Sequence, residues 1–181
     1  MMEILKHPDA RLRQVAKPVI AITDEIRTLI DDMVKTMYAS KGCGLAATQV
    51  GSDHRIFVID TEGEGNYKVF INPQIIEKKY VQNWEEGCLS LPDTLIKTKR
   101  ALVVKVQALD QFGEAFELTA RDLLSVAIQH ELDHLDGVLM IDRKRPESAE
   151  ELCKRLGFDE PSEEEKERNL RNNLDYFLRK R

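Results

Sequence analysis

Two histidines four residues apart, with a glutamate between them, are the residues of this sequence best suited to carry chemistry. His130, Glu131 and His134 form an H-E-x-x-H pattern. On a helix, residues four apart project from the same face, so both imidazoles can bind one metal ion while Glu131 stands beside a water that the ion activates. The pattern predicts a hydrolytic metal site, although its three fixed positions also occur by chance in helices that bind nothing.

The residues around this pattern predict a helix that turns both histidines inward. Thr119 and Asp122 form a T-x-x-D pair that is typical of a helix start, and Gly137 is suited to its end. An unpaired imidazole is costly to bury, so two of them in register on an apolar face favour a metal site over a structural role. The apolar residues that share the stripe with His130 and His134 are Leu123, Val126 and Ala127.

The third metal ligand has two candidates. A zincin-type peptidase would take a glutamate from further along the chain, where Glu147, Glu150 and Glu151 lie. The other candidate is Cys88, in a segment that Gly87 makes compact and that Pro92 ends. A lone cysteine is more often a small buried apolar residue than a ligand. Spacing alone leaves both candidates open.

Hydrophobic periodicity predicts one long helix that precedes the strands. Thr23 is a suitable cap for a helix that runs to about Ser40. Strands are expected at residues 56–60, 67–71, 75–81, 102–109 and 115–118, with a hairpin turn at 110–113. A helix, a run of strands and a later helix predict a single α+β domain in which antiparallel β-sheets surround the central metal-binding helix.

The last part of the chain is expected to be a separate helical segment. We expect residues 1–145 to form a catalytic metallohydrolase domain and residues 146–181 to form a C-terminal helical extension that packs on the domain or projects from it. Acidic residues 163–165 and basic residues 179–181 would complement the dipole of its helix. The apolar stripe of this helix consists of Leu170, Leu174, Phe177 and Leu178.

Composition excludes several classes of function. The 181 residues, 42% hydrophobic and 33% charged, suffice for one hydrophobic core. A net charge of -5 argues against a general nucleic-acid binder, and the first residues carry no signal-peptide core. No apolar run approaches the roughly 18–20 residues that span a bilayer. Cys43, Cys88 and Cys153 are too few for a disulfide scaffold, so reduced thiols or metal ligands in the cytoplasm are expected.

Three motifs together resemble the signature motifs of the peptide deformylase family. They are, in chain order, Gly44–Gln49 (GLAATQ), Glu86–Ser90 (EGCLS) and Gln129–His134 (QHELDH). The resemblance extends from Ile4 to Asp142. It implies that the chain hydrolyses the formyl group from the N-formylmethionine that begins newly made polypeptides, and releases formate. It also implies formylmethionyl peptides as substrates and allows a ribosome contact through the C-terminal helix.

The resemblance also implies a role for each matching residue. Cys88, His130 and His134 would hold one divalent ion, which in the family is usually Fe²⁺, with Ni²⁺, Co²⁺ or Zn²⁺ as substitutes. Glu131 would act as general base and then general acid, while the side-chain amide of Gln49 and the backbone N–H of Leu89 would stabilise the oxyanion. The residues implied to bind the substrate and its methionine side chain are Gly44, Cys43, Trp84, Glu86, Leu123, Val126 and Ala127.

The sequence departs from the family pattern at three positions. Cys43 stands where isoleucine or valine is common, Lys41 where an acidic residue is frequent, and Leu95 where some relatives have arginine. None of these changes removes a metal ligand or the base, but all three bear on how peptide residues after the methionine are held. A zincin-like metallopeptidase and a non-catalytic ribosome-associated module are the alternative functions.

Overall fold

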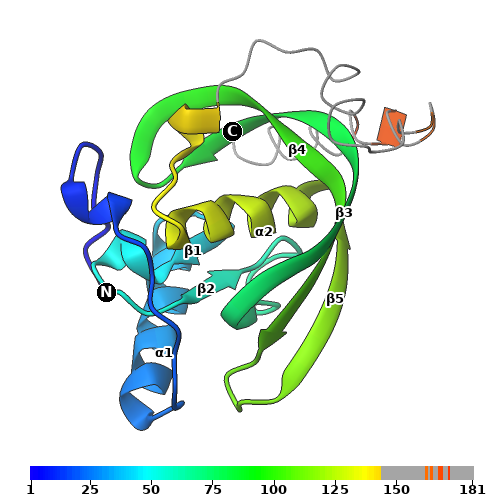
Figure 1. Cartoon of the computed structure of the whole chain (residues 1–181). Helices are drawn as coiled ribbons and strands as arrows, with labels where there is room; N and C mark the ends of the chain where they lie inside the picture. The colour runs from blue at the N-terminus through cyan, green and yellow to red at the C-terminus, as the bar shows by residue number, and fades with distance from the viewer. Residues whose placement is uncertain (144–161, 163, 165–166, 169–170, 172–181) are drawn as a thin grey trace.

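The fold is one antiparallel sheet that curves around a helix (Figure 1). The computed structural model describes residues 1–143 together with residues 162, 164, 167, 168 and 171. The predicted order of a helix, a run of strands and a later helix is confirmed. The helices are α1 (Asp24–Ala39) and α2 (Asp122–Leu135), and the strands are β1 (Gly44–Ala46), β2 (Ile56–Ile59), β3 (Lys68–Cys88), β4 (Leu91–Leu109) and β5 (Ala115–Arg121).

The sheet has the order β1-β2-β3-β4-β5, and all neighbouring strands are antiparallel. The strands expected at 67–71 and 75–81 are parts of the single strand β3, and the one expected at 102–109 is only the second half of β4. Shifts of register near Ile71 and Ile75 bend β3 against β4. This bend lets the two long strands curve around α2 (Figure 1). Periodicity missed their outer halves because cross-strand pairing stabilises polar stretches that have no apolar pattern of their own.

Helix α1 begins and ends where the sequence places it. The Thr23 side chain accepts a hydrogen bond from the N–H of Ile26, which caps the first turn. Its buried face packs against the side of the sheet that points away from α2. The apolar side chains between α1 and the sheet form one core cluster, which includes Ile26, Ile30, Met33, Met37, Leu45, Ile56, Val58 and Ile71.

Helix α2 does not begin at the predicted cap. Thr119 belongs to β5, where it pairs with Lys105, and the helix starts directly after Arg121 without a side-chain cap. The T-x-x-D prediction was therefore wrong, because the ladder between β4 and β5 already satisfies the backbone at Thr119. The stop at Gly137 is confirmed: its φ is +71°, and a Cβ there would lie 2.9 Å from the carbonyl carbon of Arg13.

Strand β2 lies between the two helices and is buried on both faces. Phe57 and Ile59 face the cluster that includes α2, whereas Ile56 and Val58 face the cluster that includes α1. The ring of Phe57 packs against Phe70, with centroids 4.7 Å apart. Helix α2 is thereby enclosed by apolar side chains, which fixes the position of the histidines that it carries.

The C-terminal extension falls almost entirely outside the described residues. Within it, Glu164, Glu167, Arg168 and Arg171 are helical. Arg168 Nε lies 3.5 Å from Asp122 Oδ2 at the start of α2. Among the described residues, no helix has both the length and the apolar character needed to cross a bilayer.

Candidate active site

The two predicted histidines lie on successive turns of α2 and point to one place. Their Nε2 atoms are 3.2 Å apart, and both residues are buried. Cys88, the last residue of β3, brings its Sγ within 3.2 Å of His134 Nε2. The three donor atoms all lie within 4.8 Å of one another. A sulfur from the sheet and two nitrogens from the helix thus converge.

This arrangement fits a divalent metal ion. Around a tetrahedral ion such as Zn²⁺, two imidazole nitrogens lie about 3.3 Å apart, and a nitrogen and a thiolate sulfur about 3.6 Å apart. The distances from His134 Nε2 to His130 Nε2 and to Cys88 Sγ, both 3.2 Å, are close to those values. Such a donor set suits several transition metals. The glutamates considered as alternative third ligands, Glu147, Glu150 and Glu151, lie outside the described residues.

A cavity of about 240 Å³ opens next to these donors. Every residue predicted for the site lines it, except His134. Five further residues line it that the motifs did not assign to the site: Ser40, Lys41, Gly42, Glu85 and Gly87. The predicted residues at its wall are Cys43, Gly44, Gln49, Trp84, Glu86, Cys88, Leu89, Leu123, Val126, Ala127, His130 and Glu131.

The side chain of Gln49 is fixed at both ends. Its Oε1 accepts a hydrogen bond from the N–H of Ala46 at 2.8 Å, and its Nε2 donates to Ser90 Oγ at 3.1 Å. The same Nε2 lies 3.6 Å from Cys88 Sγ. The amide N–H₂ therefore points toward the donor cluster, where it can stabilise a developing negative charge.

Glu131 is held against the backbone of β1. A Cβ added to Gly44 would come within 2.9 Å of the Glu131 carboxyl carbon, so only glycine leaves room for this side chain. Glu131 is 5% exposed, and its Oε2 has no hydrogen-bond partner among the described residues. Burial raises the pKa of Glu131 to about 7, against the opposing effect of the His130 charge. A carboxyl group with such a pKa can both accept and return a proton near neutral pH.

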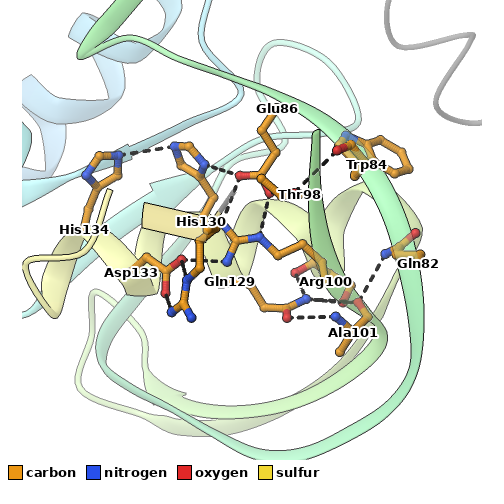
Figure 2. A network of polar contacts seen from close by, with 12 residues as sticks. Gln82, Trp84, Glu86, Thr98, Arg100, Ala101, Gln129, His130, Asp133 and His134 are labelled. Carbon is orange, nitrogen blue, oxygen red and sulfur yellow. Dashed lines mark hydrogen bonds and ion pairs between the residues drawn. The ribbon is translucent and has the colours of Figure 1, made fainter. Parts of the chain in front are cut away.

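Glu86 does more than line the cavity. Its carboxylate accepts a hydrogen bond from His130 Nδ1 at 2.6 Å and also binds the guanidinium of Arg100 (Figure 2). Thr98 donates a further hydrogen bond to it. Although burial opposes the shift, Arg100 and His130 hold the pKa of Glu86 well below its usual range. The charged carboxylate therefore fixes the orientation of the His130 ring.

Arg100 links this carboxylate to the second half of the helix motif. Its Nη1 donates to Asp133 Oδ2 at 2.6 Å (Figure 2). Arg143 binds the same carboxylate. Glu86, Arg100 and Asp133 form a buried charge network that runs beneath His130, and no sequence pattern predicted it. The only sequence signals were the charges themselves, Glu86 and Arg100 in strands that read as polar, and Asp133 inside the H-E-x-x-H pattern.

The comparisons with known proteins agree with this geometry. The sequence profile of the polypeptide deformylase family matches residues 1–150. The chain therefore belongs to the peptide deformylase family. It is 49% identical over 156 residues to the peptide deformylase of Pseudoalteromonas translucida, which covers 86% of this chain and 93% of that protein. It is 50% identical over 144 residues to the peptide deformylase of Neisseria meningitidis, and the match covers 79% of this chain and 86% of that protein.

Solved peptide deformylase structures have the same fold. The crystal structure from Legionella pneumophila superposes with a TM-score of 0.79 at 39% identity, and the match covers 99% of this chain and 96% of that one. The enzyme of Synechococcus elongatus, solved in complex with actinonin, superposes with a TM-score of 0.78 at 39% identity. That match covers 87% of this chain and 89% of the other. The family resemblance expected from the three motifs is confirmed, and this deformylase fold accounts for the single α+β domain.

Proposed function

We propose that the chain removes the formyl group from N-formylmethionyl peptides, with Cys88, His130 and His134 as the ligands of one divalent ion. The observation that carries this proposal is the convergence of the three donor atoms, within 4.8 Å, at a cavity that Glu131 and Gln49 also line. When bound, the ion lowers the pKa of water and polarises the formyl carbonyl. The remaining steps belong to side chains of the cavity.

Glu131 would move the protons of the reaction. It takes one proton from the attacking water, and it returns that proton to the amine that leaves as the C–N bond breaks. Formate and a peptide with a free N-terminal methionine are the products. The raised pKa of Glu131 and its contact with Gly44 support this role, because they place a proton-accepting carboxylate in a fixed position at the cavity wall.

Gln49 and Leu89 would stabilise the oxyanion that forms on the formyl oxygen. The orientation of the Gln49 amide toward Cys88 supports its part, and Leu89 lies at the cavity wall directly after Cys88. The removal of one such donor typically costs about 10²–10³ in kcat. The methionine side chain would lie among apolar cavity residues, which include Trp84, Leu123, Val126 and Ala127.

The test is turnover of a formyl-Met peptide by metal-loaded protein. We expect formate release from formyl-Met-Ala-Ser, none from the acetylated peptide, and no cleavage of casein. Glu131→Gln should keep its metal content and lose about 10²–10⁴ in kcat. If wild-type protein with its metal fully bound released no formate, the proposed deformylase activity would be refuted. Cleavage of casein would favour a metallopeptidase.

We further propose that the resident ion is Fe²⁺. One thiolate and two imidazoles also accept Ni²⁺, Co²⁺ and Zn²⁺, so the donor set supports iron without selecting it. Anaerobically loaded Fe²⁺ protein should lose activity in air, through oxidation of the ion or of Cys88, whereas Ni²⁺ protein should keep it. A cytoplasmic location is part of this proposal, because thiols stay reduced there.

The division of the chain is also a proposal. All described donors and cavity residues lie between Ser40 and His134, which supports residues 1–145 as the catalytic domain. Residues 146–181 are proposed to contact the ribosome as a helical extension. Removal of residues 161–181 should abolish cosedimentation with ribosomes and leave hydrolysis of short peptides intact. Loss of both ribosome cosedimentation and peptide hydrolysis would show that the segment is needed for the fold.

A further inference from the structure

Lys41 occupies the rim of the cavity in an unusual backbone conformation. It follows Ser40, the C-cap of α1, and has a φ of +55°. Its N–H donates to the carbonyl of Tyr38 at 2.9 Å, and the N–H of Gly42 donates to the carbonyl of Met37 at 2.9 Å. This pair of hydrogen bonds is the helix ending in which the left-handed residue is usually glycine.

The chain therefore has a lysine at a position where glycine would be less strained. The next residue, Gly42, is a glycine for a different reason: a Cβ there would lie 2.7 Å from Leu89 Cδ1. Strained backbone of this kind concentrates at sites where a particular side chain is needed. At position 41 the strained residue carries a long side chain with an ammonium group, and it lines the cavity.

The charge of Lys41 is not neutralised by its surroundings. Lys41 is exposed and has no ion-pair partner in the part of the chain that the structure describes. Of the acidic residues at the cavity, Glu86 and Glu131 are buried, and Glu85 is half-buried, with its backbone paired to that of Lys97 in the β3–β4 ladder. Lys6 adds a second ammonium group nearby, because its Nζ donates to the carbonyl of Leu89. Two ammonium groups thus lie near Leu89, and the exposed Lys41 is accessible to a carboxylate.

The distance from the reacting end to Lys41 matches the start of a peptide. Gly44, which contacts Glu131, lies three positions after Lys41 in the chain, so the Cα atoms of Lys41 and Gly44 are at most about 11 Å apart. Two extended residues after the methionine span about 7 Å, which the long lysine side chain can bridge. Lys41 is exposed and lines the same cavity as the donors Cys88 and His130, so a peptide with its formyl group at the donors can extend toward Lys41.

We propose that Lys41 makes the enzyme favour nascent chains with an aspartate or glutamate in the first two positions after the formylmethionine. This inference rests on the proposed deformylase function. The contact is an exposed ion pair, so its effect on selectivity is modest. We expect kcat/KM to be about two- to fivefold higher for an Asp peptide than for the matching Asn peptide at low salt.

The test compares formyl-Met-Asp-Ala and formyl-Met-Ala-Asp with their Asn counterparts. Lys41→Asn tolerates the left-handed conformation and removes the charge, so the Asp preference should vanish; Lys41→Glu should reverse it, and Lys41→Arg should keep it. The control is Lys35→Asn, which removes a charge from an exposed position of α1 outside the cavity. In the wild type, the ratio of kcat/KM for the Asp peptide to that for the Asn peptide should fall toward one at about 0.5 M salt.

A second measurement is independent of catalysis. Binding of the products Met-Asp-Ala and Met-Asn-Ala can be followed by the fluorescence of Trp84, which lines the cavity and is the single tryptophan of the chain. We expect the same charge preference in affinity, and its loss in Lys41→Asn. Equal Asp-to-Asn ratios in the wild type and Lys41→Asn would overturn this inference. An enzyme inactive on every formylated peptide would overturn the proposed function instead.

Discussion

The buried charge network beneath His130 and the rim around Lys41 differ most in their access to water. In the network, the side chains of Glu86 and Arg100 are 2% and 4% exposed, and each charge is bound by an opposite one. At the rim, Lys41 is exposed and has no ion-pair partner among the described residues. Charged side chains at the cavity wall and beneath it therefore differ in their exposure to water.

This difference separates positioning from selection. Between buried charges the Coulomb interaction is strong and the geometry is fixed, so the network can hold the His130 ring in one orientation. At the rim, water and salt screen the interaction, so a charge there adds a modest preference and can change at little cost to the fold. The removal of one charge should therefore cost much more stability in the buried network than at the exposed rim.

The largest effect is expected from Arg100→Met, which leaves the Glu86 and Asp133 carboxylates buried without this guanidinium. The free energy of unfolding should fall by about 3–5 kcal/mol, because breaking a buried ion pair strands a charge. Metal affinity should fall about 10–100-fold as His130 loses its support. Denaturant unfolding and competitive metal titration measure both.

The matched control for Arg100→Met is Lys79→Met. It breaks the exposed pair between Lys79 and Glu77, whose charged atoms are 2.7 Å apart. Because exposed pairs contribute about 0–1 kcal/mol, this variant should be nearly as stable as the wild type. Similar losses in the two variants would contradict the contrast between buried and exposed charges.

A second prediction concerns the contact between Gly44 and Glu131. Gly44→Ala places a methyl group where the Glu131 carboxyl lies, so the base must move. We expect kcat to fall about 10²-fold with the metal content unchanged, because small displacements of a catalytic group cost this much. Steady-state kinetics and metal analysis provide the measurement.

The double variant Gly44→Ala/Glu131→Asp tests the cause of that loss. The shorter aspartate leaves room for the added methyl group, so the double variant should be no slower than Glu131→Asp alone. Additive losses would mean that Gly44→Ala acts elsewhere than on Glu131.

Asp60 is an intermediate case between the two regions. It is 7% exposed, and its N–H donates to the carbonyl of Cys43 at the cavity wall. Burial alone would raise the pKa of Asp60, but hydrogen bonds outweigh it and hold the pKa below its usual value. The donors to its carboxylate are the Tyr38 hydroxyl and the N–H groups of Glu62, Gly63 and Asn66.

Asp60 should therefore make stability depend on pH at the acid end. A carboxyl whose pKa is lower in the folded state stabilises the fold above its unfolded pKa of about 3.9, and this contribution is lost as pH falls through the folded value. Asp60→Asn should lower the free energy of unfolding by about 1–3 kcal/mol at pH 7. The difference from the wild type should narrow between about pH 5 and pH 3. A gap that stays constant over this range would contradict the assignment.

The smallest effect on stability is expected from Lys41→Gly, which should raise the free energy of unfolding, whereas Arg100→Met and Asp60→Asn should lower it. Glycine adopts the left-handed conformation without strain, so the variant should be more stable by about 0.5–1 kcal/mol. Lys35→Gly, in the interior of α1, should be less stable by about 1 kcal/mol. Thermal unfolding of both variants checks this pair. A destabilised Lys41→Gly would show that the lysine serves the fold.

Local patterns predicted the features whose causes are local. The cap at Thr23, the helix that follows it and the stop at Gly137 depend on residues within a few positions of one another. The spacing of His130 and His134 placed two donors on one face of a helix before any fold was known. The three motifs added Cys88, and the structure brings its sulfur to the same point.

The errors arose where distant strands decide the outcome. The prediction of a helix start at Thr119 failed because β4 pairs with this residue, and the outer halves of β3 and β4 were missed because each stabilises the other. Glu86 was expected only at the methionine pocket, whereas the structure shows it bound to His130 and Arg100. No local pattern connects residues 86, 100 and 133, since their contacts exist only after the sheet has curved around α2.

By itself, the sequence determined the chemistry that is possible: two imidazoles, a thiolate and a carboxylate at spacings that suit a metal hydrolase, together with the family to which the chain belongs. Only the tertiary structure decided how these groups are held. Burial raises the pKa of Glu131, the Glu86 carboxylate orients His130, and the end of α1 places an exposed lysine at the cavity rim. Burial and long-range contact depend on the whole fold, whereas spacing along a helix depends only on neighbours in the chain.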